Sequence, residues 1–359
     1  MRLLIASLLV LFTHAGRAEA MPGNWRDADL GQAIIEGVAD RDHIWLRGAT
    51  RKVVRFVRAT GERTVVAEDV VDLLPDNGRL WLLGQRSGTN LYYVVNLRDP
   101  VSAAGVGPAQ RRGDRQLHPG EEAEGQVLGL ISWPGLNLPS IVTQRGVLPL
   151  SPGQRRQRFA ATLAPHAHLA AVGEGGLYAG YNWGEWGGGL RRVDLPNGTI
   201  SFVTEEGEKP CEGALNPACD PIVGLFPDHA RPGCVIVGSG LSHLGMSKGQ
   251  VHRVCGSAIE PVFSTPTPAA GDRWMMRPQP WPLDGLFETP DGWIATSRDR
   301  YFSSEGGRVE EKPLPAFRNW AGLRISDEQD GVLFVVSACC WGSAENPTLY
   351  RALAIPVGE

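Results

Sequence analysis

The chain has 359 residues, with 35 basic and 39 acidic side chains and a formal net charge of −4. A mildly acidic chain lacks the clustered Lys and Arg on which nucleic acid binding rests, so we expect no nucleic acid partner. The 45 Gly and 27 Pro residues predict many turns and exclude a fold made of long helices.

The first twenty residues, MRLLIASLLVLFTHAGRAEA, have the pattern of a secretory signal. Arg2 precedes an apolar run from Leu3 to Phe12, and Ala18-Glu19-Ala20 matches a cleavage site. The run is too short to span a bilayer as an anchor. We therefore expect residues 1–20 to be a signal peptide and residues 21–359 to be one domain with no membrane span. The mature protein is then periplasmic or secreted, and we expect a monomer.

A local pattern recurs along the rest of the chain: turn residues ending in Gly precede a burst of large apolar residues. Asn-Gly and Asp-Gly before alternating apolar residues are hairpin signals, because glycine reaches the positive φ of those turns at little cost. The clearest copies are PDNGRLWLLG from Pro75, EGGLYAGYNW from Glu174, RPGCVIVGSG from Arg231, PDGWIATS from Pro290 and QDGVLFVVSA from Gln329. With the short apolar segments around it, each copy predicts a four-stranded antiparallel unit.

Seven such units, each of about 40–50 residues, fit between residues 31 and 356, which is the size of a propeller blade. The segment DGWIATSRDRYFSSEGG from Asp291 resembles the repeats of bacterial two-component-regulator-type and YVTN-like propellers. We therefore predict an all-β, seven-bladed β-propeller. Because a closed propeller must join its ends, residues 24–35 are expected to supply an N-terminal strand that closes the last blade. Two β-sandwich domains, or another all-β arrangement, are the alternatives.

In that family, the loops between the second and third strands of a blade and the loops between blades lie on one face. The resemblance therefore implies that five unusual segments open on the same face, where loops on a rigid scaffold often carry function. They are NWGEWGGG from Asn182, CEGALNPAC from Cys211, GSGLSHLGMSKG from Gly238, GDRWMMRPQPW from Gly271 and CCWGSAENP from Cys339.

Indole rings stack on sugars and cations, and a carboxylate beside them accepts hydrogen bonds from hydroxyl or ammonium groups. The candidate ligand-binding residues are Trp183, Glu185, Trp186, His243, Lys248, Arg273, Trp274 and Trp341. The alternative is that the indoles cap the blades by packing while Glu185 pairs with Arg191 or Arg192. Both interpretations remain open from the sequence.

The six cysteines predict disulfides in an oxidising compartment. The expected pairs are Cys211 with Cys219 and Cys234 with Cys255, the latter across two neighbouring strands. Cys339 and Cys340 form either a strained bridge between adjacent residues or two thiols on opposite faces of a strand.

No metal site is expected. His243 and Met246 could ligate a soft metal, but two such residues without further ligands are weak support for one. No cofactor is expected either; a quinone cofactor and a cation in the channel are the minor alternatives.

Three functions remain open. The favoured one is a binding propeller for a small polar molecule or a glycan. The others are a hydrolase or lyase with Glu185, helped by His243, as acid or base, and a protein-interaction scaffold.

Overall fold

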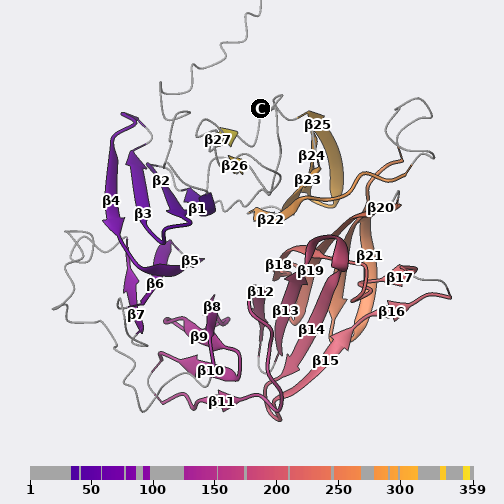
Figure 1. Ribbon diagram of the computed structural model, residues 1–359, viewed down its shortest axis with the longest axis horizontal. Coiled ribbons are helices and arrows are strands. Elements are labelled where there is room, and N and C mark those ends of the chain that lie inside the picture. Colours follow the sequence, from indigo (N-terminus) through magenta and orange to yellow (C-terminus); the bar gives the residue numbers. More distant parts are fainter. Residues whose placement is uncertain are drawn as a thin grey trace, which may run out of the picture.

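The computed structural model describes residues 34–39, 42–57, 59–76, 78–85, 92–97, 125–151, 153–173, 176–208, 211–243, 246–267, 279–289, 292–297, 300–313, 332–336 and 351–355. These residues form antiparallel β-sheets, which confirms the predicted all-β class. The sheets follow one another in chain order around a ring (Figure 1). Across these same residues, none of the helices has the length and apolar character needed to cross a membrane.

The first half of the ring holds three blades. The first blade contains β1 (Ile34–Ala39), β2 (His43–Gly48), β3 (Val53–Val57) and β4 (Arg63–Ala67). The second has three strands among the described residues, β5 (Val70–Asp76), β6 (Arg79–Gln85) and β7 (Tyr92–Asn96). The third contains β8 (Val127–Ile131), β9 (Ser140–Thr143), β10 (Gly146–Pro149) and β11 (Gln157–Arg158).

The second half holds three four-stranded blades and two small ribbons. The fourth blade contains β12 (Ala167–Val172), β13 (Gly176–Asn182), β14 (Gly188–Asp194) and β15 (Thr199–Val203). The ribbon of β16 (Glu205–Glu206) and β17 (Gly213–Ala214) follows it. The fifth blade contains β18 (Ile222–Pro227), β19 (Cys234–His243), β20 (Met246–Cys255) and β21 (Ala258–Ser264). The sixth contains β22 (Gly285–Thr289), β23 (Gly292–Ser297), β24 (Arg300–Glu305) and β25 (Arg308–Pro313), and the last ribbon pairs β26 (Val332–Val336) with β27 (Arg351–Ile355).

The hydrophobic core lies between blades rather than within one sheet. Val142 of the third blade and Leu177 of the fourth are both fully buried in one cluster. Leu190 of the fourth blade and Val237 of the fifth share the next cluster. These blades therefore bury their apolar faces against their neighbours, as in other stacked repeat folds.

Carboxylates on β1 and β5, the first strands of the first and second blades, also join neighbouring blades. Both strands have a β-bulge near their start, and the residue after the bulge is Glu36 in β1 and Asp72 in β5. Glu36 accepts a hydrogen bond of 3.2 Å from the backbone N–H of Leu73, and Asp72 accepts one of 2.7 Å from that of Leu130. A side chain of one blade thus satisfies a backbone donor of the next blade at the same repeat position.

The predicted number of seven blades was wrong, because the described residues form six blades of three or four strands. The expected seventh unit is represented there by the two-stranded sheet of β26 and β27, which lies beside β1. The predicted closure of the last blade by residues 24–35 stays a prediction, because residues 24–33 lie outside the described part. From Ile34 onward the chain pairs with β2 inside the first blade.

Candidate functional site

The Trp-Glu-Trp segment forms an exposed turn between the second and third strands of the fourth blade, where the propeller prediction placed it. It consists of Asn182 and the 3₁₀ turn η3 (Gly184–Trp186) with Trp183 between them. Trp183 is 46% exposed and Trp186 is 71% exposed, and Glu185 between them is also exposed. The strand does not continue through this turn, so the period-two rule for strands does not decide which of these side chains share a side.

The turn is held by its own backbone and by the loop that follows the fourth blade. Asn182 accepts a hydrogen bond from the N–H of Gly184 at 2.9 Å through its side-chain Oδ1. Gly188 donates to the carbonyl of Pro217 at 2.9 Å. At Gly189, where φ is +73°, a Cβ atom would lie 2.7 Å from Cα of Pro217. The glycines that follow the indoles therefore let two backbones approach closely.

The loop beneath the turn is closed by a disulfide. Cys211 and Cys219 are bonded, with their Cα atoms 5.3 Å apart, as predicted. Within this loop Asn216 accepts hydrogen bonds from the backbone N–H groups of Cys219 and Asp220. The Trp-Glu-Trp turn thus rests on a loop whose unfolded conformations are restricted by a covalent bond.

One indole also packs on its own strand. Trp183 lies with its ring centroid 5.8 Å from that of Tyr181, which is fully buried. On the neighbouring strand the guanidinium carbon of Arg191 lies 5.0 Å from the ring centroid of Tyr181 and 4.9 Å from that of Phe202. The packing interpretation therefore applies in part to Trp183, whereas Trp186 is mostly exposed. Burial, opposed by the nearby Arg191 charge, raises the pKa of Tyr181.

Lys248 takes part in a buried ion pair. Its Nζ lies 2.8 Å from Oδ2 of Asp220, whose side chain is 0% exposed, and it donates to the carbonyl of Gly213 at 3.1 Å. Burial raises the pKa of Asp220, and the Lys248 charge opposes that shift. Asp220 also accepts a hydrogen bond of 2.8 Å from the backbone of Asn216. The ammonium group thus joins the fifth blade to the disulfide loop that carries the turn.

A histidine that the sequence did not single out lies on the same strand as Lys248. His252 is 3% exposed, and its Nδ1 has no hydrogen-bond partner within the part of the chain that the structure describes. Burial, with a further contribution from the Lys248 charge, lowers the pKa of His252 to about 4. A neutral imidazole therefore lies between the fourth and fifth blades at neutral pH.

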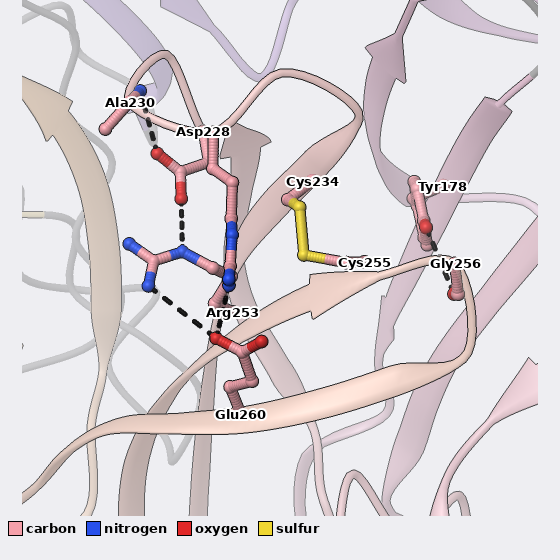
Figure 2. The surroundings of a disulfide bond; sticks show 9 residues. Tyr178, Asp228, Ala230, Cys234, Arg253, Cys255, Gly256 and Glu260 are labelled. Atoms are coloured by element: carbon pink, nitrogen blue, oxygen red, sulfur yellow. Dashed lines mark hydrogen bonds and ion pairs between the residues drawn. A yellow bond between two sulfur atoms is a disulfide. The ribbon is translucent and has the colours of Figure 1, made fainter.

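The segment GSGLSHLGMSKG was expected to be a loop, and this was wrong. β19 runs to His243 and β20 begins at Met246, and the two strands pair along ten residues each. Glycine fits this hairpin because a Cβ at Gly238 would lie 2.7 Å from Cβ of Leu286 in the sixth blade. At the base of the hairpin the predicted Cys234–Cys255 disulfide is present (Figure 2).

The structure does not bring all candidate residues together. Arg273, Trp274, Trp341 and the Cys339–Cys340 pair lie outside the described residues. His243 is placed by its backbone at the end of β19, opposite Met246. Across the described ranges no group of three His, Cys, Asp or Glu side chains is arranged to hold a metal ion.

Comparison with known proteins supports the fold. No family model and no curated protein matches the sequence. Among solved structures, the β-propeller domain of Cps50 (Swd1) from Myceliophteria thermophila aligns over 91% of this chain and 98% of its own, with 12% identity and a TM-score of 0.51. The structure described as YCF48 bound to D1 peptide aligns over 91% of this chain and 93% of its own, with 11% identity and a TM-score of 0.52. The chain is therefore similar in fold to these proteins, and it is a β-propeller with four-stranded antiparallel blades.

Proposed function

We propose that this β-propeller is a binding scaffold that recognises a segment of a partner protein through the Trp183–Trp186 turn. The observation that carries the proposal is the exposure of two indoles on a turn that packs against the Cys211–Cys219 disulfide loop. An exposed Trp on a rigid support supplies a large contact area at low entropic cost, which is why Trp is enriched among the dominant residues of interfaces.

Two features of the described residues support binding over a purely structural role. Trp186 is 71% exposed, so its removal creates no cavity in a core. The turn is preorganised by Asn182 and by the disulfide loop, and a preorganised surface loses less conformational entropy on binding. A fold neighbour of this chain holds a D1 peptide, so the architecture is compatible with peptide recognition.

The same proposal includes export. Residues 1–20 act as a signal peptide, and residues 21–359 form the mature domain in the periplasm or outside the cell. Two disulfides support this location, because disulfides persist in oxidising compartments.

A displayed library of random peptides, selected on the purified mature protein, tests the function. We expect enriched peptides to bind the parent protein and to lose at least about tenfold in affinity to Trp186→Ala, because an anchor indole contributes about 2 kcal/mol or more. The thermal midpoint of Trp186→Ala should stay close to that of the parent. The proposal fails when no sequence is enriched, or when the enriched peptides bind Trp186→Ala as tightly as the parent.

A small polar molecule or a glycan is the second candidate, and the position of Glu185 between the two indoles favours it. A carboxylate beside aromatic rings can accept hydrogen bonds from sugar hydroxyl groups while the rings stack on the sugar. A glycan array probed with the parent and with Glu185→Gln tests it: binding by the parent that the variant loses supports this candidate. The hydrolase or lyase alternative has no specific observation in its favour.

A further inference from the structure

The fourth blade carries a continuous row of stacked side chains on one side of its outer three strands. The row consists of Trp183, Tyr181, Arg191 and Phe202, and we refer to these four residues as the Arg191 stack. Arg191 and Phe202 are direct cross-strand partners on β14 and β15, and Tyr181 lies on β13 on the same side. The stack is buried at Tyr181 and open at both ends, with Trp183 46% and Phe202 51% exposed.

The guanidinium at the centre of the stack is held by rings. Its central carbon lies 5.0 Å from the Tyr181 ring centroid and 4.9 Å from the Phe202 ring centroid, within the range of cation–π attraction. Within the described residues Arg191 makes no ion pair with a carboxylate, and its buried Nε has no hydrogen-bond partner. Guanidinium N–H donors match carboxylate oxygens in a bidentate geometry, so a carboxylate is the partner that this group would bind most strongly.

Further positive charge lies along the same seam between the third and fourth blades. The backbone N–H of Ala160 donates to the carbonyl of Gly198 at 2.8 Å, and the backbone of the exposed Arg158 also lies against Gly198, in the turn before β15. Phe202 is four residues from Gly198 along β15, a distance of about 13 Å at the rise of a strand. An approaching anionic segment would therefore meet positive charge along the outer edge of this seam.

We propose that the Arg191 stack is the recognition site for an acidic residue flanked by apolar residues in the partner segment. The carboxylate binds the terminal Nη groups of Arg191, because Nε is buried, and the apolar neighbours pack on Trp183 and Phe202. This inference rests on the proposed function, since it names the chemistry of the segment that the Trp183–Trp186 turn binds. A peptide is favoured over a smaller anion because the exposed rings lie at the two ends of a row that crosses three strands, about 10 Å at the usual strand spacing.

The test uses the intact mature protein and defined probes. The probes are acetyl-Leu-Glu-Leu-amide, its Gln counterpart, and glucuronate. Binding is followed by NMR at the Nε–H signal of Arg191, assigned by its absence in Arg191→Gln, and at the indole N–H signals. The matched control is Arg192→Gln, because Arg192 is also partly buried and lies on the opposite side of β14, near Tyr178.

We expect the Glu peptide to shift the Arg191 signal at concentrations at which the Gln peptide does not. Arg191→Gln should weaken binding of the Glu peptide about tenfold or more, since hydrogen bonds to charged groups contribute about 1.5–3 kcal/mol, and Arg192→Gln should leave it unchanged. Equal shifts by the Glu and Gln peptides, or no shift by either, would overturn the proposal. Tighter binding of glucuronate than of the Glu peptide would also overturn it and assign the stack to an acidic sugar.

The two proposals fail in different ways. Library-selected peptides that need Trp186 but carry no acidic residue would leave the scaffold function standing and remove the role of Arg191. A library without any enriched sequence, together with a Glu-specific shift at Arg191, would instead remove the scaffold function and leave an anion site.

Discussion

Replacing His252 by Gln should remove much of the acid sensitivity of the fold. Burial lowers the pKa of His252 to about 4 in the folded protein, whereas an unfolded His has a pKa of about 6.5. The folded state therefore binds fewer protons than the unfolded state between these two values. The contribution of His252 to stability is fully present above pH 6.5 and is lost as the pH falls toward 4.

The size of the effect follows from the two pKa values. Complete loss corresponds to about 3 kcal/mol, and about 2 kcal/mol of it should be lost between pH 7 and pH 4.5. Urea unfolding at several pH values measures this, as the difference between the parent protein and His252→Gln. Asp220 changes stability in the opposite sense, because its raised pKa favours the folded state as the pH falls. It is present in both proteins, so to first order its contribution cancels in the difference.

The NMR titration of the His252 imidazole provides an independent control. Its midpoint in the folded protein should lie near pH 4 if burial between the blades is the cause. Parallel stability curves for the parent and His252→Gln, or an imidazole midpoint near 6.5, would refute the reasoning. Either result would mean that water or an anionic partner stabilises the charged imidazole.

Three further variants test a contact between blades, the disulfide within the fifth blade and the packing beneath the turn. Asp72→Ala should lower the free energy of unfolding by about 1–3 kcal/mol, because the backbone N–H of Leu130 in the next blade loses its acceptor. Replacing Cys234 and Cys255 together by Ser should lower it by about 3 kcal/mol, since the bond closes a loop with a sequence separation of 21. Gly189→Ala should destabilise the Trp-Glu-Trp turn and weaken peptide binding, because the added Cβ meets the disulfide loop at a positive φ. Chemical denaturation checks the first two, and peptide affinity checks the third.

Each of these has a clear opposite result. Asp72→Ala with an unchanged unfolding free energy would mean that another acceptor replaces the carboxylate. A double Cys variant as stable as the parent would show that pairing of β19 with β20 already restricts that loop in the unfolded chain. Unchanged peptide affinity in Gly189→Ala would mean that the packing of the turn on the disulfide loop does not contribute to peptide binding.

Local patterns in the sequence determined most of the secondary structure and both described disulfides. Turn residues before alternating apolar residues, as at Asn197-Gly198, specify hairpins because their backbone preferences are properties of single residues. The Cys211–Cys219 pair closes a loop of eight residues in sequence, so its pairing is also a local matter. The repetition of such hairpins was sufficient to indicate a propeller.

Tertiary structure decided the features that depend on neighbouring blades. The number of blades depends on which backbone edges pair with one another. In the structure β1 pairs with β2 within the first blade. The Gly-rich segment from Gly238 forms a strand, and a Cβ at Gly238 would lie 2.7 Å from Cβ of Leu286, so the sixth blade can pack this closely only against glycine there. Local propensity opposes that outcome, so the packing of another blade overrides it.

The site divides in the same way. The exposed indoles on a turn after β13 could be anticipated, because glycines and the hairpin pattern place them there. The partners of Lys248, the neutral state of His252 and the stacking of Arg191 could not, because each arises between strands or blades. They arise because charged groups are buried between blades and aromatic rings contact side chains of neighbouring strands. A single stretch of sequence does not specify which groups meet in this way.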